Sequence, residues 1–131
     1  MKRLLPALGL ILLAGCGLAD ASAEVRTITI DIEHSAFVPS EVNVRAGERV
    51  RFIVRNNDPI DHEFIIGNDH IQLIHEEGTE RHHGARDGEV SIPAQAERVT
   101  SYTFDEPGRL IYGCHLPQHY DYGMKGDITV S

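Results

Sequence analysis

The chain has 131 residues, a length typical of one domain, and its 20 acidic against 12 basic side chains give a net charge of −8 at pH 7. An acidic surface argues against nucleic acid and against anionic lipid as partners. A protein partner attracted by charge would have a basic surface, although the acidic residues can also act only to keep the protein in solution. We expect a monomer.

Residues 1–23 have the layout of a signal peptide followed by a short tether. Lys2 and Arg3 precede an apolar run that is too short to span a bilayer. The sequence Leu13-Ala14-Gly15-Cys16 matches the lipobox of bacterial lipoproteins, which predicts a lipid on Cys16. Ordinary cleavage after Ala23 is the alternative. Either route predicts export to the periplasm or cell envelope, and the predicted lipid would be the link to a membrane.

The chain from residue 24 onward reads as short strands separated by turns. Val50, Phe52 and Val54, for example, alternate with polar residues, and this period of two is typical of a half-buried strand. Seven or eight such strands predict that residues 24–131 form one all-β domain, an antiparallel Greek-key sandwich. Strands are expected at residues 26–32, 41–45, 49–55, 64–66, 90–92, 98–104, 109–113 and 127–130.

The segment from Gly67 to Gly88 is polar and does not alternate. We expect it to be a surface excursion between two strands, in which Asp69 to Glu80 can form a short helix. Its histidines are His70, His75, His82 and His83. A second metal site among them is an alternative, but the adjacent pair at 82–83 lacks the spacing of a chelate and no soft donor lies nearby in the sequence.

The segment from Tyr112 to Gly126 carries the clearest functional signal. It contains a thiolate donor, Cys114, an imidazole donor, His119, and a thioether donor, Met124. Soft sulfur ligands suit Cu(I), while imidazole and a strong thiolate bond tolerate Cu(II), so this set predicts a blue-copper site. The cysteine should end one strand and the methionine should precede the next, with the histidine midway between them. A loop of this length can place all three donors around one ion.

A fourth ligand would come from elsewhere in the fold, and His62 is the best candidate. It follows a turn-rich segment and leads into an apolar strand, a context that His34 and His70 lack. His115 directly follows Cys114, so its side chain should point away from the ion.

Two other interpretations of the sulfur residues remain open. Cys114 would be the lone thiol of an exported domain once Cys16 is lipidated or removed, and an unoccupied thiol in an oxidising compartment invites oxidation. A disulfide between the two cysteines is an alternative to a metal bond. For Met124 the alternative to a ligand role is a place in the apolar core, since methionine often fills gaps there.

The cysteine loop, the Asn-rich turn before His62 and the pattern Phe37-x-Pro39-x-x-Val42-x-Val44-x-x-Gly47 together resemble the cupredoxin family of plastocyanin- and azurin-like type 1 blue copper proteins. The resemblance covers about the last hundred residues. It implies one type 1 copper ion. The implied ligands are the imidazole nitrogens of His62 and His119, a short bond from Cys114 and a long axial bond from Met124.

The resemblance also implies how such a site would work. The edge of His119 near the surface would be the exit for the electron. Glu63 departs from the family, because many cupredoxins have an asparagine there that forms hydrogen bonds across the ligand loops. Hydrogen bonds around the cysteine sulfur tune the reduction potential of a copper site. Because Glu63 departs from the family pattern, the resemblance does not predict the potential.

Function is expected to follow from these ligands. The first hypothesis is an electron carrier between redox proteins of the bacterial cell envelope. The second is a copper-homeostasis or copper-delivery protein that uses the same ligands. An enzyme is not expected, because copper oxidases and nitrite reductases need further histidine pairs and the chain contains no His-x-His. A module of this fold that binds no metal would be the remaining alternative.

Overall fold

The computed structural model describes residues 25–78 and 86–131. The predicted signal peptide, the lipobox with Cys16 and the alternative cleavage site at Ala23 lie outside the described residues, as do His82 and His83. Within the two described ranges, no helix has the length and apolar character that crossing a membrane requires.

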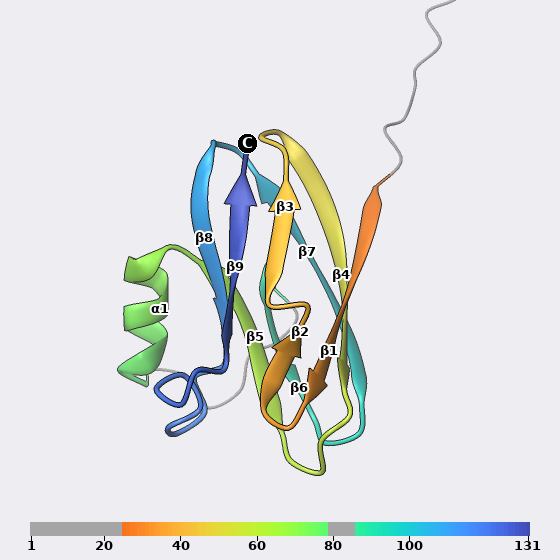
Figure 1. Ribbon diagram of the computed structural model, residues 1–131, viewed down its shortest axis with the longest axis vertical. Helices are drawn as coiled ribbons and strands as arrows, with labels where there is room; N and C mark the ends of the chain where they lie inside the picture. Colours follow the sequence, from red (N-terminus) through yellow and green to blue (C-terminus); the bar gives the residue numbers. More distant parts are fainter. Residues whose placement is uncertain (1–24, 79–85) are drawn as a thin grey trace, which may run out of the picture.

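The described residues form nine strands in two sheets (Figure 1). The first sheet has the order β2-β1-β4-β7, and its strands are β1 (Arg26–Glu33), β2 (Ala36–Val38), β4 (Glu48–Asn56) and β7 (Glu97–Phe104). The second has the order β3-β9-β8-β5-β6, and its strands are β3 (Glu41–Val44), β5 (His62–Gly67), β6 (Glu89–Ile92), β8 (Gly108–Gly113) and β9 (Lys125–Val130).

The predicted β-sandwich is confirmed, but its sheets are mixed and not wholly antiparallel. β1 pairs with β4 in parallel, and β3 pairs with β9 in parallel. Parallel neighbours need a connection that crosses back over the fold, and the chain makes one when β3 joins the second sheet before β4 returns to the first. The strand β2 was not predicted, because three residues are too few to show an alternating pattern.

The core lies between the sheets and is built from alternating side chains. Val50, Phe52 and Val54 are fully buried, as their period of two predicts. The rings of Phe64 and Tyr112, on β5 and β8, lie 5.3 Å apart between centroids. Burial of each such side chain contributes roughly 1.5–3 kcal/mol to stability. The core thereby fixes the two strands whose ends carry the predicted histidine and cysteine ligands.

The predicted helix is confirmed as α1 (Asp69–Glu76), which ends four residues before the expected Glu80. Asn68 caps it, because its side chain accepts a hydrogen bond from the backbone N–H of Ile71 at 3.0 Å. Asp69 adds a negative charge in the first turn, where the helix dipole favours it.

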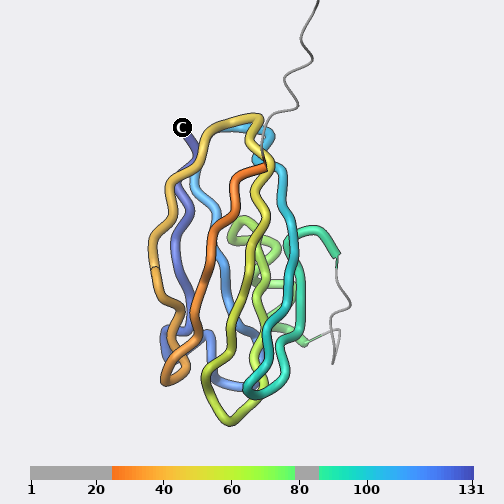
Figure 2. Tube along the Cα trace, turned by 90° about the vertical axis from the view of Figure 1, so that its right-hand side faces the viewer, coloured from red at the N-terminus to blue at the C-terminus, as the bar shows by residue number. Residues whose placement is uncertain are grey.

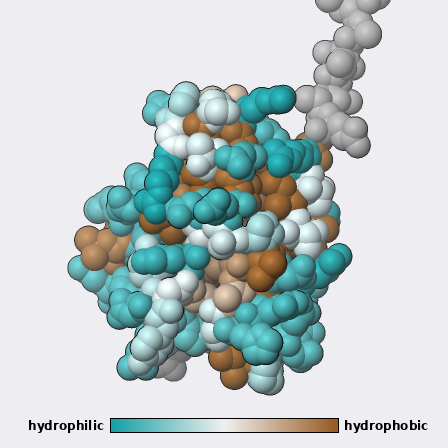
Figure 3. Space-filling model, viewed as in Figure 1, coloured by the Kyte–Doolittle hydropathy of each residue, from teal (hydrophilic) through white to brown (hydrophobic). Residues whose placement is uncertain are grey.

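Helix α1 packs against the outer face of the second sheet (Figure 1). Gln72 is buried there and donates hydrogen bonds to the backbone carbonyls of Ile65 on β5 and Ile111 on β8, at 3.1 and 3.0 Å. Strand β5 is therefore covered on both faces and every residue of it is buried. On the solvent side the helix exposes Leu73 and Ile74. Figure 3 shows hydrophobic surface, in brown, on the side of the molecule where α1 lies.

Candidate metal centre

Three predicted ligands meet at one end of the sandwich. The turn before β5 and the loop after β8 lie together at the lower end in both views (Figures 1 and 2). The Nδ1 atoms of His62 and His119 are 3.3 Å apart, and the sulfur of Cys114 lies 3.9 and 3.3 Å from them, respectively. Among the described residues, they are the one set of three or more His, Cys, Asp or Glu whose donor atoms all lie within 4.8 Å.

The size of this donor triangle fits a metal ion. The point equidistant from the three atoms lies about 2 Å from each of them, close to the bond of roughly 2.0–2.1 Å between zinc and an imidazole nitrogen. One sulfur and two imidazole nitrogens are also the trigonal donor set of blue-copper sites. The residues present therefore fit a copper ion.

The pairing of β5 with β8 positions two of the donors. His62 is the first residue of β5 and Cys114 follows the last residue of β8, and the antiparallel register places Ile65 opposite Gly113. The backbone N–H of Glu63 consequently donates to the sulfur of Cys114 at 3.3 Å. A donor aimed at the sulfur stabilises its thiolate form.

The ligand loop closes on itself and brings Met124 beside Cys114. The backbone N–H of Cys114 donates to the carbonyl of Met124 at 3.1 Å, and the N–H of Met124 donates to the carbonyl of His119 at 2.9 Å. The methionine side chain is buried in the same apolar cluster as Cys114. Its role as the axial ligand stays a prediction, and so does its alternative role as a core residue.

Burial favours the uncharged forms of two of the donors, Cys114 and His62, before a metal binds. Cys114 is a free cysteine that is 0% exposed, and burial raises the pKa of its thiol to about 11. His62 is 1% exposed, and burial lowers its pKa although the hydrogen bond with Asp58 opposes this shift. An incoming ion therefore meets the neutral imidazole of His62 and must displace the thiol proton of Cys114. His119 is only half-buried, so it is the histidine nearer to solvent, as expected.

Glu63 links the two ligand-bearing segments through its side chain as well as its backbone. Its carboxylate accepts a hydrogen bond from the backbone N–H of His115 at 3.3 Å. The side chain is buried, and burial raises its pKa above the usual 4.5. A glutamate thus bridges the ligand loops at the position where the family resemblance led us to expect an asparagine.

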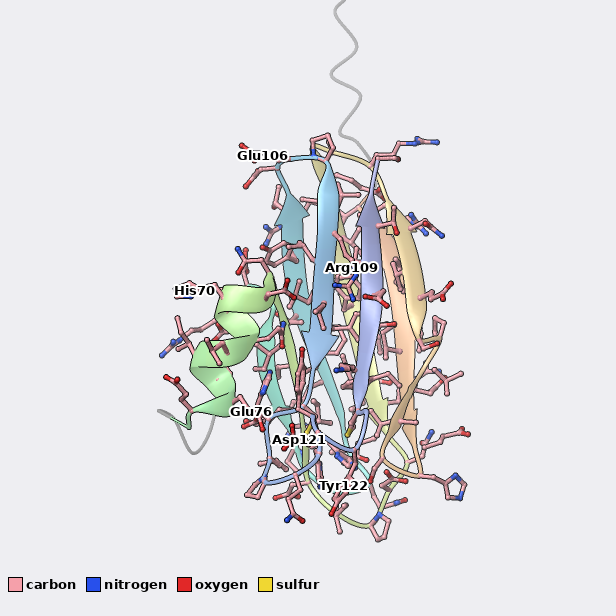
Figure 4. All side chains as sticks on the ribbon, turned by 60° about the vertical axis from the view of Figure 1, so that its left-hand side comes forward. His70, Glu76, Glu106, Arg109, Asp121 and Tyr122 are labelled. Atoms are coloured by element: carbon pink, nitrogen blue, oxygen red, sulfur yellow. The ribbon has the colours of Figure 1, made fainter. Side chains whose placement is uncertain are left out.

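His115 points away from the donor triangle, as predicted, and packs under α1. Its Nδ1 lies 2.7 Å from a carboxylate oxygen of Glu76 and its Nε2 lies 2.7 Å from the side-chain oxygen of Gln72. The ring stacks between those of Tyr120 and His75, at centroid distances of 4.6 and 5.8 Å. Figure 4 shows the end of α1 that carries Glu76 beside the ligand loop. The helix therefore braces this loop.

The histidines of the predicted excursion do not form a second metal site within the described residues. His70 lies on α1 and projects away from the sheets (Figure 4), and neither it nor His75 belongs to a set of three close donors. The remaining two, His82 and His83, lie outside the described residues.

One residue of the site was missed in the sequence. Asp58 lies in the turn-rich segment before His62, for which no contact with the site was predicted, yet its carboxylate lies 3.0 Å from Nε2 of His62. An acidic residue four positions before the candidate histidine was the available signal. A spacing of four has no fixed meaning in a loop, so the contact depends on how the turn folds.

Comparison with known proteins agrees with this geometry. The sequence model of the family described as copper binding proteins, plastocyanin/azurin family, matches residues 24–131. The chain is 31% identical over 117 residues to the copper-resistant cuproprotein CopI of Rubrivivax gelatinosus, which covers 85% of this chain and 70% of that protein. It is 27% identical over 145 residues to the CopI of Pseudomonas aeruginosa, with 86% and 80% covered.

Solved structures share the fold. Auracyanin B superposes with a TM-score of 0.67 at 20% identity, over 81% of this chain and 88% of that one. Auracyanin A of Chloroflexus aurantiacus, described as a blue copper protein, superposes with a TM-score of 0.62 at 23% identity, over 80% and 98% of the two chains. At these identities the likeness shows the fold alone.

Proposed function

Because the chain belongs to the plastocyanin/azurin family of copper-binding proteins, we propose that it binds one copper ion at His62, Cys114, His119 and Met124 and thereby contributes to copper resistance. The observation that carries the proposal is the triangle of one sulfur and two imidazole nitrogens, already at metal-binding spacing. When bound, copper supplies a one-electron couple, and the sulfur and nitrogen donors suit both of its oxidation states.

Copper resistance is supported by the relatives and by the burial of Cys114. The proteins that cover most of this chain at 31% and 27% identity are named copper-resistant cuproproteins. The sulfur of Cys114 is inaccessible to solvent, so a bound ion would be shielded from reaction with other molecules. A protein of this kind needs no catalytic cycle, and we propose a binding protein and not an enzyme.

Electron transfer is the second candidate function. It is favoured by the half-buried position of His119, which leaves one ligand near solvent, and by the braced loop, which would change little between oxidation states. Its partners would be redox proteins, and the acidic composition of the chain favours partners with basic surfaces. For either function we propose a location in the periplasm or cell envelope with a lipid on Cys16 as the membrane anchor, because residues 1–16 have the layout of a lipoprotein leader.

Growth in copper tests the proposal. A strain lacking the gene should be more sensitive to copper than its parent, and the wild-type gene should restore tolerance while Cys114→Ser should not. The control is Ser101→Ala, which changes a residue of β7 away from the donors. Equal tolerance in the deleted and parent strains, with respiration impaired in the deleted strain, would favour electron transfer instead.

Loss of labelling by radioactive palmitate in Cys16→Ala tests the lipid anchor.

A further inference from the structure

We propose that Asp58 is a positioning residue of the copper site, which fixes the ring of His62 so that Nδ1 faces the ion and which adds a negative charge that favours the oxidised metal. The inference rests on the proposed function in one respect, that His62 binds copper. It goes further in assigning two roles to a residue that does not bind the ion. Asp58 orients the ring of His62, and it influences the relative stability of Cu(II) and Cu(I).

The contact between Asp58 and His62 determines which nitrogen is free. The carboxylate lies 3.0 Å from Nε2, and both side chains are buried. Both oxygens of this carboxylate accept hydrogen bonds from backbone N–H groups, so the group acts as an acceptor towards Nε2 as well, and Nε2 carries the hydrogen. The lone pair is then on Nδ1, the atom that faces Cys114 and His119. A carboxylate in this position also makes a histidine ligand more basic.

The carboxylate is itself fixed by the turn between β1 and β2. One oxygen of Asp58 accepts from the backbone N–H of His34 and the other from that of Ser35, both at 2.7 Å. Each oxygen of the carboxylate therefore already accepts a backbone hydrogen bond, and the group cannot rotate without losing these bonds.

The backbone around Asp58 is held just as firmly. Its N–H donates to the side-chain oxygen of Asn56 at 3.0 Å, and the buried amide of Asn56 donates to the carbonyls of Ile60 and Pro93 at 2.7 and 3.0 Å. The carbonyl of Asp58 accepts from the N–H of Gln95 at 3.1 Å. The position of the carboxylate is thus set by the sandwich and does not depend on a metal ion.

The matched pair of variants is Asp58→Asn and Asp61→Asn. Asp61 lies on the same turn and influences His62 through its charge, but its side chain is exposed and accepts instead from the N–H of Ala94 at 2.9 Å. Both variants remove one negative charge near the histidine. Only the first replaces the carboxylate beside Nε2 with an amide, which can present either its accepting oxygen or its donating NH2 group to the ring. The difference between the variants therefore isolates positioning from simple charge.

The first measurement is the nitrogen NMR spectrum of the imidazoles in the full exported protein without copper. Wild type and Asp61→Asn should show His62 with the hydrogen on Nε2, while Asp58→Asn should show a mixture of the two tautomers. Hydrogen on Nδ1 in the wild type would overturn the proposal, even if Asp58→Asn does not fold. Because this measurement needs no metal, it decides the role of Asp58 even if the protein binds no copper and the proposed function fails.

The second measurement is the reduction potential of the copper-loaded proteins. Mutation of the hydrogen-bond partner behind a histidine ligand typically weakens metal binding by roughly 10- to 100-fold. We expect Asp58→Asn to weaken Cu(II) more than Cu(I), which raises the potential by about 59 mV for each tenfold difference. Asp61→Asn should raise it less. Equal shifts in the two variants would show that charge alone acts and would overturn the positioning role.

Discussion

The backbone N–H of Glu63 donates a hydrogen bond to the sulfur of Cys114 at 3.3 Å, beside the pairing of β5 with β8. The side chain of the same glutamate accepts from the backbone N–H of His115. One residue of β5 therefore holds both the sulfur and the residue that follows it. Hydrogen bonding around a copper-bound cysteine tunes the reduction potential. The position of Glu63 on β5 should therefore influence the potential of the site.

Replacing Glu63 with glutamine should flatten the pH dependence of stability. Burial raises the pKa of the carboxyl above 4.5, so this group contributes stability that is fully present below pH 4.5 and is lost as the pH rises through the folded-state pKa. The amide does not titrate. As the pH rises above 4.5, the free energy of unfolding of the copper-free wild type should therefore show this loss, and that of the variant should not.

Urea unfolding at several pH values measures the difference. Comparing the two proteins cancels the titration of groups that do not interact with Glu63. His62 is one of these, and its lowered pKa acts in the opposite direction. Identical pH profiles would show that the buried carboxyl ionises at its ordinary pKa, against the direction given by its burial.

The thiol of Cys114 should react slowly in the protein without copper. Only the thiolate reacts with iodoacetamide, and with a pKa of about 11 the group is almost wholly protonated at neutral pH. The rate of alkylation should rise about tenfold per pH unit up to that pKa. Copper should block the reaction throughout. Mass spectrometry records the modified fraction, and a rate at neutral pH equal to that of free cysteine would be incompatible with this burial.

Replacing Met124 with glutamine should keep copper bound but change its visible spectrum and its potential. A weak axial ligand tunes a blue-copper site without supplying most of its affinity. The side chain is buried, so the substitution also has a cost in stability, which thermal unfolding without copper would measure separately. An unchanged spectrum would remove Met124 from the ligand set and leave it as a core residue.

Replacing Gln72 with alanine should loosen α1 from the sheet. The change leaves the carbonyls of Ile65 and Ile111 without this buried donor, and each unsatisfied group costs about 1–3 kcal/mol. Leu73→Ala is the control, because that side chain is 56% exposed on the same helix and surface changes usually stay within about 0.5 kcal/mol. Equal free energies of unfolding for both variants would contradict the bracing role of the helix.

The sequence allowed the local parts of the site to be predicted. Cys114, His119 and Met124 belong to one loop between two alternating strands, so their nearness follows from chain connectivity. His62 could be chosen because a turn and an apolar strand surround it. A helix within the polar segment from Gly67 to Gly88 could also be predicted, but its packing on β5 and β8 could not.

The contacts that depend on distant pairing could not be predicted. Glu63 meets the sulfur of Cys114 only because β5 and β8 pair in one particular register, and no pattern within either strand specifies that register. The link from Asp58 to the turn at His34 likewise crosses between separate parts of the sandwich. The parallel pairs were missed for the same reason, since alternation shows which residues face inward but not which strand is the neighbour.

A copper titration of the exported protein, followed by its visible absorption spectrum, tests most directly the claim that these four residues hold one copper ion. We predict an endpoint of one copper per chain and an intense thiolate-to-copper band, with the band absent in Cys114→Ser. Wild-type protein that binds no copper, or a band that persists in Cys114→Ser, would contradict the account.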